Sequence, residues 1–163
     1  MENLISETEK FVVQLLNDEL DNKFVYHNLA HTQRVVEKVD ELSELSQLND
    51  IEKTHLSLSA WLHDTGYTVK VDNHEDESVK IATTFLNDQG YSQNDIDAVC
   101  SLILATKMNY EPKNQSEKII RDADCAHIGS KNYMDISALL RKKWEITCDK
   151  ILTEEEWLIE NIN

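Results

Sequence analysis

The sequence has 163 residues, of which 40% are hydrophobic, with only three glycines and one proline. This length fits one domain, and so few turn-forming residues argue against an all-β fold, which needs a turn about every 8–12 residues. With 16 basic and 31 acidic residues the net charge is −15, which disfavours nucleic-acid polymers and anionic membranes as partners. A small phosphorylated ligand remains compatible, because a metal ion and a few cations reverse the potential inside one pocket.

The cysteines and the N-terminal segment indicate in which cellular compartment the protein is expected. Cys100, Cys125 and Cys148 are widely spaced without a CxxC pair. Cys100 and Cys125 lie in apolar helical runs and are predicted to be buried free thiols, which fits a reducing cytosol. Residues 1–7 lack the basic start and apolar stretch of a secretory signal, and no run approaches the roughly 18 apolar residues of a membrane span. We therefore expect a cytoplasmic protein.

Apolar residues recur at three- and four-residue steps along most of the chain, which predicts an all-α fold. Asn28, Asp50 and Ser92 precede such segments and are expected to cap helices. The single proline, Pro112, falls in a polar loop at 107–114. In chain order, the predicted helices cover residues 2–20, 28–48, 50–66, 74–88, 92–106, 116–127 and 132–149, with a last helix from Thr153. Because this last amphipathic pattern is cut off at the end of the sequence, we expect that the chain is a fragment of a longer protein.

Four ionisable residues fall where an unpaired charge costs several kcal/mol. His31, His63 and Asp124 lie on apolar faces of the second, third and sixth predicted helices, Asp64 follows His63, and Ile128 is expected on the inward face with Asp124. Such mixed nitrogen and oxygen ligands suit Mn, Fe, Co, Ni, Zn or Mg. A single inward histidine is more often a hydrogen-bonded core residue, and neighbouring residues point about 100° apart around a helix axis. Spacing alone therefore does not decide whether these residues bind a metal or are hydrogen-bonded core residues.

Three segments together resemble a known family: Tyr26–Val36 (YHNLAHTQRVV), Ala60–Gly66 (AWLHDTG) and Ile119–Asp124 (IIRDAD). They are similar to the HD superfamily of metal-dependent phosphohydrolases, whose pattern is H…HD…D, over about residues 24–130. The resemblance implies a compact bundle of about seven to eight helices around a central metal site, and residues 1–163 are expected to form one HD domain. The metal ligands that it implies are His31, His63, Asp64 and Asp124.

Other residues separate the subfamilies. The Glu-Asp pair of the (p)ppGpp hydrolases is absent after His63-Asp64, and Tyr67 stands where the cyclic di-GMP phosphodiesterases have a lysine. Dinuclear members carry two further histidines between the doublet and the last aspartate, and only His74 is available here. One divalent ion is therefore expected. His74-Glu75 with Ser78 resembles the HE-x-x-S helix start of small, stand-alone predicted HD phosphohydrolases.

The hypothesis that follows is hydrolysis of a phosphomonoester or phosphodiester by a metal-activated water. Asp64 is expected to double as ligand and proton acceptor. His27 is a candidate proton donor, with a surface or capping role as the alternative, and His74 is a candidate phosphate contact at a helix start. The candidate phosphate-binding cations, each alternatively a solvated surface charge, are Arg34, Lys107 and Arg121.

Several readings stay open at this stage. The substrate is expected to be small and nucleotide-like, a homo-oligomer is compatible with the sequence, and the physiological substrate is not encoded in any motif. The main alternative is a metal-binding, nucleotide-sensing regulatory module with little turnover. An oxidase with a di-iron centre needs more ligands than the chain offers, and a metal-free helical interaction domain leaves the inward ionisable residues unexplained.

Overall fold

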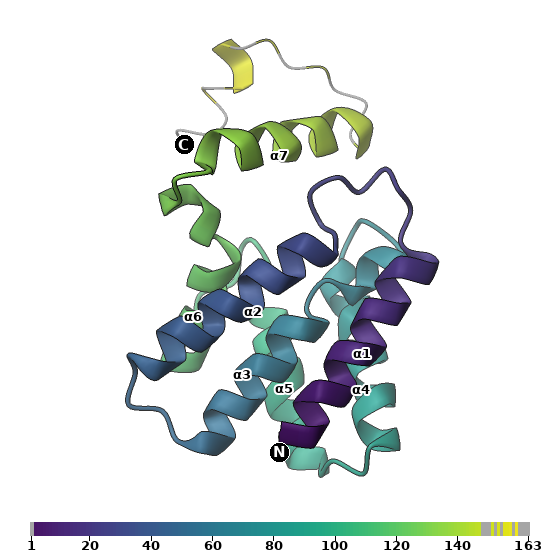
Figure 1. The fold of residues 1–163 in the computed structure, drawn as a ribbon, viewed down its shortest axis with the longest axis vertical. Coiled ribbons are helices and arrows are strands. Elements are labelled where there is room, and N and C mark those ends of the chain that lie inside the picture. The colour runs from purple at the N-terminus through teal and green to yellow at the C-terminus, as the bar shows by residue number, and fades with distance from the viewer. Residues whose placement is uncertain (1, 148–150, 152, 154, 158, 160–163) are drawn as a thin grey trace.

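The computed structural model describes residues 2–147, 151, 153, 155–157 and 159, and these residues form helices and loops without a β-strand. The predicted all-α bundle is thus confirmed (Figure 1). The helices are α1 (Glu2–Glu19), α2 (Leu29–Glu44), α3 (Asp50–Leu62), α4 (His74–Asp88), α5 (Gln93–Ala105), α6 (Gln115–Asp124) and α7 (Tyr133–Thr147), with two short 3-10 helices, η1 (Thr65–Thr68) and η2 (Ala126–Gly129).

Helix α3 is the centre of the bundle. It contacts α1, α2, α4, α5 and α6, and every residue from Thr54 to Leu62 is buried. A helix that is apolar all round is stable only when other elements cover every face. Leu58, Trp61 and Leu62 pack towards α1, α4 and α5, whereas Leu56 and Ala60 pack towards α2, α5 and α6. The C-terminal end of α3 therefore delivers the residues that follow it into the interior.

The structure differs from the sequence prediction at the start of α3. Asn49, not Asp50, is the N-cap, because its side chain accepts hydrogen bonds from the backbone N–H groups of Ile51 and Glu52. The Glu52 carboxylate in turn accepts from the Asn49 N–H at 2.9 Å, which completes a capping box. Asp50 is then the first helical residue, where its charge favours the positive end of the helix dipole.

A second difference lies after α6. The predicted helix 116–127 ends at Asp124, and the chain turns through Cys125 into the 3-10 helix η2. This change of path rotates the following side chains away from the core. Ile128 is 64% exposed, so its predicted inward position is wrong. The prediction of a buried thiol is also wrong for Cys125, which is exposed, whereas Cys100 is half-buried and Cys148 lies outside the described residues.

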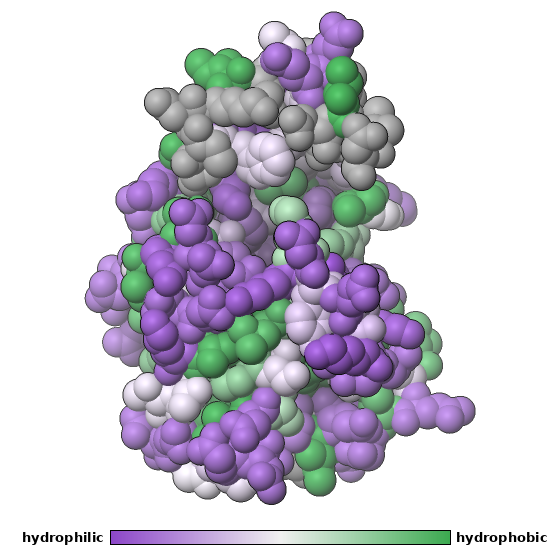
Figure 2. All heavy atoms as spheres, turned by 180° about the vertical axis from the view of Figure 1, so that it is seen from behind, coloured by the Kyte–Doolittle hydropathy of each residue, from purple (hydrophilic) through white to green (hydrophobic). Residues whose placement is uncertain are grey.

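Helix α7 lies across one end of the bundle, beyond η2 (Figure 1). After it, Thr153 and Glu156 form a capping box, with backbone-to-side-chain hydrogen bonds of 2.9 and 3.3 Å. Hydrophilic side chains predominate on the back of the bundle, with small apolar areas between them (Figure 2). No helix in the described part of the chain combines the length and apolar character needed to cross a bilayer.

Candidate metal centre

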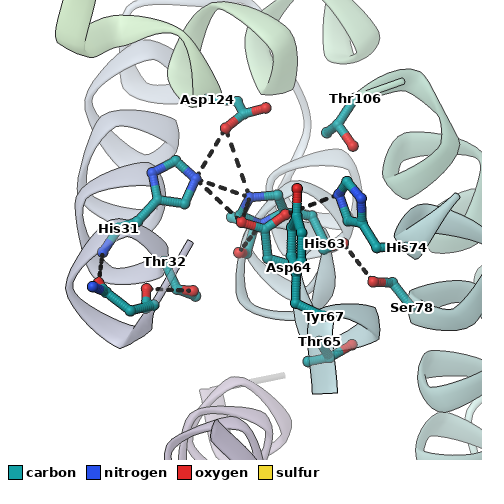
Figure 3. A network of polar contacts seen from close by, with 12 residues as sticks. His31, Thr32, His63, Asp64, Thr65, Tyr67, His74, Ser78, Thr106 and Asp124 are labelled. Carbon is teal, nitrogen blue, oxygen red and sulfur yellow. Dashed lines mark hydrogen bonds and ion pairs between the residues drawn. The ribbon is translucent and has the colours of Figure 1, made fainter. Parts of the chain in front are cut away.

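Four side chains from α2, α6 and the turn after α3 converge on one point (Figure 3). Nε2 of His31 lies 3.1 Å from Oδ1 of Asp124 and 3.4 Å from Oδ2 of Asp64. Nε2 of His63 lies 3.3 Å from Oδ2 of Asp64, 3.7 Å from Oδ1 of Asp124 and 3.4 Å from Nε2 of His31. The structure therefore brings together all four residues that the sequence nominated as metal ligands.

These separations fit a small divalent cation. Four ligands at about 2.0–2.1 Å from a tetrahedral ion lie about 3.3–3.4 Å from one another, close to the 3.1–3.7 Å found here. The buried Oδ2 of Asp64 makes no well-aligned hydrogen bond in the described part of the chain. A buried carboxylate oxygen without a partner is costly, and a cation among these atoms would remove that cost. The donor set of two imidazoles and two carboxylates can thus hold a metal ion.

The start of α2 fixes the position of His31. Asn28 caps the helix, accepting a hydrogen bond from the His31 backbone N–H at 3.2 Å and donating one to the carbonyl of Val25 at 2.9 Å. The cap holds His31 in the first turn, where its side chain is 3% exposed and points inward beside Val35. The Asn-x-x-His spacing in this segment is therefore a capping arrangement that also orients a ligand.

The turn after α3 lets neighbouring His63 and Asp64 face one point. His63 keeps α-helical torsion angles, but Asp64 departs from them at φ −102°, ψ 3°, and the 3-10 helix η1 follows. Nδ1 of His63 donates to the carbonyl of Ala60 at 2.9 Å, which leaves Nε2 for a metal. The 100° separation expected on a regular helix thus does not apply here.

A close approach of α4 holds this turn in place. The hydroxyl of Ser78 donates to the carbonyl of His63 at 2.5 Å and accepts from the N–H of Gly66 at 2.8 Å. A Cβ atom on Gly66 would lie 1.9 Å from the carbonyl oxygen of His74. Only glycine therefore allows η1 and α4 to meet at this distance.

The charges of the clustered side chains shift one another's pKa values. Burial opposes a charge on His63, but the carboxylates of Asp64 and Asp124 outweigh it and raise the pKa of His63 to about 9. Burial likewise favours the neutral acids, yet His63 holds the pKa of Asp64 well below its usual range, and His31 and His63 lower the pKa of Asp124. At neutral pH a proton on His63 therefore balances the carboxylates when no cation is present.

Beside the cluster, His27 and His74 each stack on the ring of Tyr67, with centroids 4.4 and 3.9 Å away. Nε2 of His74 lies 3.4 Å from Oδ1 of Asp64, the oxygen opposite to the ligand cluster. His27 offers a ring nitrogen close to His31 and Asp64, its buried Nδ1 has no hydrogen-bond partner among the described residues, and burial lowers its pKa to about 3. Both candidate catalytic histidines are thus next to Asp64.

A family model for the HD domain matches residues 28–129, which is well over half of the chain. The chain belongs to the HD domain family. Its members are metal-dependent phosphohydrolases in general, and the match spans all four convergent ligands. No curated protein and no solved structure gives a significant match to the chain.

Two cavities adjoin the candidate metal ligands of this HD domain. One, of about 230 Å³, is lined by His31, Arg34 and Asp124 among other residues. Arg34 makes no hydrogen bond or ion pair with another residue that the structure describes. The second cavity, of about 300 Å³, is lined by Asp64 and Asp124, by both candidate catalytic histidines, and by Arg121.

The other two candidate phosphate-binding cations have partners within the protein. Arg121 donates to the carbonyls of Ala105 at 2.7 Å and Lys107 at 2.6 Å, and so holds the turn after α5. Lys107 forms an ion pair of 2.7 Å with Asp76 on α4 and lines neither cavity. The structure thus brings Arg34 and Arg121 to the cavities but not Lys107.

The sequence analysis missed residues that line the larger cavity. Tyr26, Tyr67, Lys143 and Trp144 are among them, and Thr106 occupies the wall between Asp124 and His74 (Figure 3). Tyr26 and Tyr67 adjoin the two histidine motifs, and that proximity is a signal that was available. Nothing in the amphipathic pattern of α7 indicates that Lys143 and Trp144 lie over a site formed by α2, α3 and α6.

Proposed function

We propose that this HD-family protein is a metal-dependent phosphohydrolase that acts on a phosphomonoester or phosphodiester of a small, nucleotide-like substrate. The observation that carries the proposal is that the ligand cluster is open to two cavities, and that the side chain of Asp124 is 25% exposed. Structural metal sites are closed by protein ligands, whereas catalytic sites keep a position for water or substrate. Cavities of about 230 and 300 Å³ also suit one small molecule better than a polymer.

In this proposal His31, His63, Asp64 and Asp124 hold one divalent ion. When bound, such an ion lowers the pKa of water and polarises a phosphoryl oxygen. Asp64 has a second role through Oδ1, which lies 3.4 Å from Nε2 of His74, whereas Oδ2 faces His31 and His63. We assign this oxygen to accept the proton of the attacking water, with Nε2 of His74 at 3.4 Å to take the proton onward.

Two further side chains are assigned to the substrate. Arg34 offers a guanidinium to the cavity that also contains His31 and Asp124, and a planar fork of N–H donors suits two oxygens of one phosphate. His27 is assigned to the leaving group, because its Nδ1 is buried and without a partner beside Asp64. Because burial lowers its pKa to about 3, His27 is neutral at pH 7 in the free protein. In this proposal the charge of a bound phosphate raises that pKa, His27 takes a proton from solvent, and it then donates this proton to the leaving-group oxygen.

The first experiment determines metal content and turnover on the same purified protein. Bound metal is quantified by mass spectrometry, and hydrolysis is then followed with Mn, Co, Ni and Mg on nucleoside monophosphates, cyclic nucleotides and p-nitrophenyl esters. We expect stoichiometric metal and turnover of at least one class. Bound metal without any turnover would favour the regulatory module over the hydrolase.

A matched pair of variants tests the ligand cluster. Asp124→Asn and Asp122→Asn make the same change two positions apart on α6, but Asp122 is exposed and lies outside the cluster. We expect Asp124→Asn to lose metal and about 100-fold or more of the activity, with Asp122→Asn unchanged. Full activity in Asp64→Ala would refute the mechanism.

A further inference from the structure

The two candidate catalytic histidines share one aromatic neighbour, Tyr67. The centroid of the Tyr67 ring lies 4.4 Å from that of His27 and 3.9 Å from that of His74, with interplanar angles of 14° and 22°. Both contacts are therefore stacked, and such ring pairs are worth about 0.5–1.5 kcal/mol beyond the area that they bury. In Figure 3 the Tyr67 ring stands beside Asp64 and His74. One side chain of η1 thus contacts both imidazoles next to Asp64.

The His27 ring has no hydrogen bond that would fix its orientation. Its Nδ1 is buried without a partner, and no hydrogen bond or ion pair of the ring is present among the residues that the structure describes. His27 also lies in the loop before α2, so no helix restrains its backbone. Packing therefore sets its plane, edge-on against Tyr26 at 4.7 Å and His31 at 5.5 Å, and face-on against Tyr67.

The polar contacts of the His74 ring are long. Its Nδ1 donates to the carbonyl of Val71 at 3.3 Å and lies 3.6 Å from a carboxylate oxygen of Glu75. Its Nε2 lies 3.4 Å from Oδ1 of Asp64. All three distances exceed the usual range of about 2.7–3.2 Å for an N–H···O hydrogen bond. The stacked contact with Tyr67 is therefore needed to hold the His74 ring in one orientation.

Tyr67 itself is held on several sides. Its backbone N–H donates to the carbonyl of Asp64 at 3.1 Å, so the ring is tied to the backbone of a candidate ligand. The residue is 5% exposed, its ring packs against the buried Phe24 at 5.4 Å, and its hydroxyl contacts Nζ of Lys143 at 3.4 Å. A side chain that is fixed by its own packing can orient the groups stacked on it.

We propose that Tyr67 is a positioning residue of this candidate metal centre, and that its ring fixes the planes of His27 and His74 beside Asp64. The proposal rests on the proposed function for the proton-transfer roles of the two histidines. Proton transfer requires donor and acceptor within hydrogen-bond reach, and a displacement of about 1 Å can cost about 100-fold in rate. The ring carries this role rather than the hydroxyl, because the ring makes both stacked contacts.

The kinetic test removes the ring and leaves every candidate ligand in place. Tyr67→Leu and Tyr67→Met both lack a ring but differ in shape and flexibility, so that one can replace the other if it does not fold. Each should retain bound Mn. On an ester of the panel above that the wild type hydrolyses, kcat should fall about 10- to 100-fold with KM within about threefold. Tyr67→Phe keeps the ring and should restore most of the loss.

A spectroscopic test does not depend on turnover. Protons over an aromatic face resonate upfield, so the carbon-bound ring protons of His27 and His74 should move downfield in the two variants without a ring, each loaded with Mg. The signals of His55, which pairs with α5 away from the site, should not move. The matched control is Tyr91→Leu, which removes a ring that meets His55 edge-on at 6.0 Å. It should affect at most the His55 signals and leave kcat within about twofold.

Three results would overturn the proposal: wild-type kcat in a folded variant without the ring, an equal loss of kcat in Tyr67→Leu and Tyr91→Leu, or unmoved signals of both site histidines. A loss in Tyr67→Phe as large as in Tyr67→Leu would also overturn it, because the hydroxyl would then carry the effect. Moved signals in a protein that hydrolyses no ester would reject the hydrolase alone, whereas turnover with unmoved signals would reject the positioning role alone.

Discussion

The hydroxyl of Ser78 on α4 donates a hydrogen bond of 2.5 Å to the carbonyl of His63, the candidate metal ligand at the end of α3. The same hydroxyl accepts the N–H of Gly66, so one fully buried side chain joins both ends of the turn that carries Asp64 (Figure 3). Neither bond touches a ligand atom. The geometry of the candidate metal site therefore depends on a serine that is not one of its candidate ligands.

Replacement of this serine should loosen the ligand cluster. We expect Ser78→Ala to lower the free energy of unfolding by about 1–3 kcal/mol, because the His63 carbonyl and the Gly66 N–H lose a buried partner. Metal affinity should fall about 10- to 100-fold. Thr84→Ala is the control, since it removes an exposed hydroxyl that bonds only within α4. Chemical denaturation and metal titration measure both effects, and equal affinities in the two variants would contradict this role.

The contact between η1 and α4 gives a second prediction. A Cβ on Gly66 would meet the carbonyl of His74 at 1.9 Å, whereas a Cβ on Gly129 meets no atom within 4 Å. Gly66→Ala should therefore destabilise the protein by about 3 kcal/mol and weaken metal binding, and Gly129→Ala should change the stability by less than about 0.5 kcal/mol. Thermal unfolding of both variants is the measurement. A Gly66→Ala protein as stable as Gly129→Ala would show that α4 adjusts without loss.

Arg34 is predicted to act on binding of the phosphate. Arg34→Met should raise the KM for a phosphate ester roughly 10- to 100-fold, because a charge-assisted hydrogen bond is lost. Lys38→Met is the matched control, since Lys38 lines the same cavity but forms an ion pair with Glu41. Steady-state kinetics of Arg34→Met and Lys38→Met measures the KM and kcat of each variant. A kcat/KM for Arg34→Met that equals that of Lys38→Met would place Arg34 outside the phosphate site.

The sequence predicted the helices and the four convergent side chains because both depend on local pattern and on the family resemblance. Asn28 capping α2 and the apolar run that buries α3 are encoded within a few residues. The chelating geometry of His63 and Asp64 was not derivable in this way. It depends on one residue, Asp64, that leaves the helical path at a turn held by α4.

The sequence did not predict correctly which side chains are buried, or which line the larger cavity, where the chain changes direction. Cys125 and Ile128 were expected inside because periodicity was extended through a helix that ends at Asp124. Lys143 and Trp144 were missed as cavity-lining residues because their position depends on how α7 packs against the end of the bundle, and no spacing within α7 specifies that. The family resemblance therefore identified the four candidate ligands, whereas the cavity wall contributed by α7 follows only from how the helices pack.

The number of bound ions is a further prediction. We expect one ion per chain, since Thr106 lies where a further ligand from the end of α5 would be needed (Figure 3). His74→Ala should then keep one ion while lowering turnover, and His31→Ala should lose the ion. Metal analysis of the dialysed wild type, His74→Ala and His31→Ala gives the number of ions that each protein binds. Two ions in the wild type and one in His74→Ala would instead assign His74 and Oδ1 of Asp64 to a second metal position.

Metal binding should strengthen as the pH rises towards 9. In the metal-free protein the carboxylates of Asp64 and Asp124 overcome burial and raise the pKa of His63 from 6.5 to about 9. A metal must displace that proton, so the logarithm of its affinity should rise by about one per pH unit between pH 7 and 9 and then level off.

The stability of the metal-free protein should move in the opposite direction. A pKa raised on folding stabilises the protein fully below 6.5, and this contribution is lost as the pH rises through about 9. The difference in unfolding temperature between metal-loaded and metal-free protein should therefore widen from pH 6.5 to 9. Calorimetric titration in buffers of different ionisation enthalpy should also detect release of about one proton per ion at pH 7. Binding that is independent of pH over this range, with no proton released, would show that His63 is not a ligand.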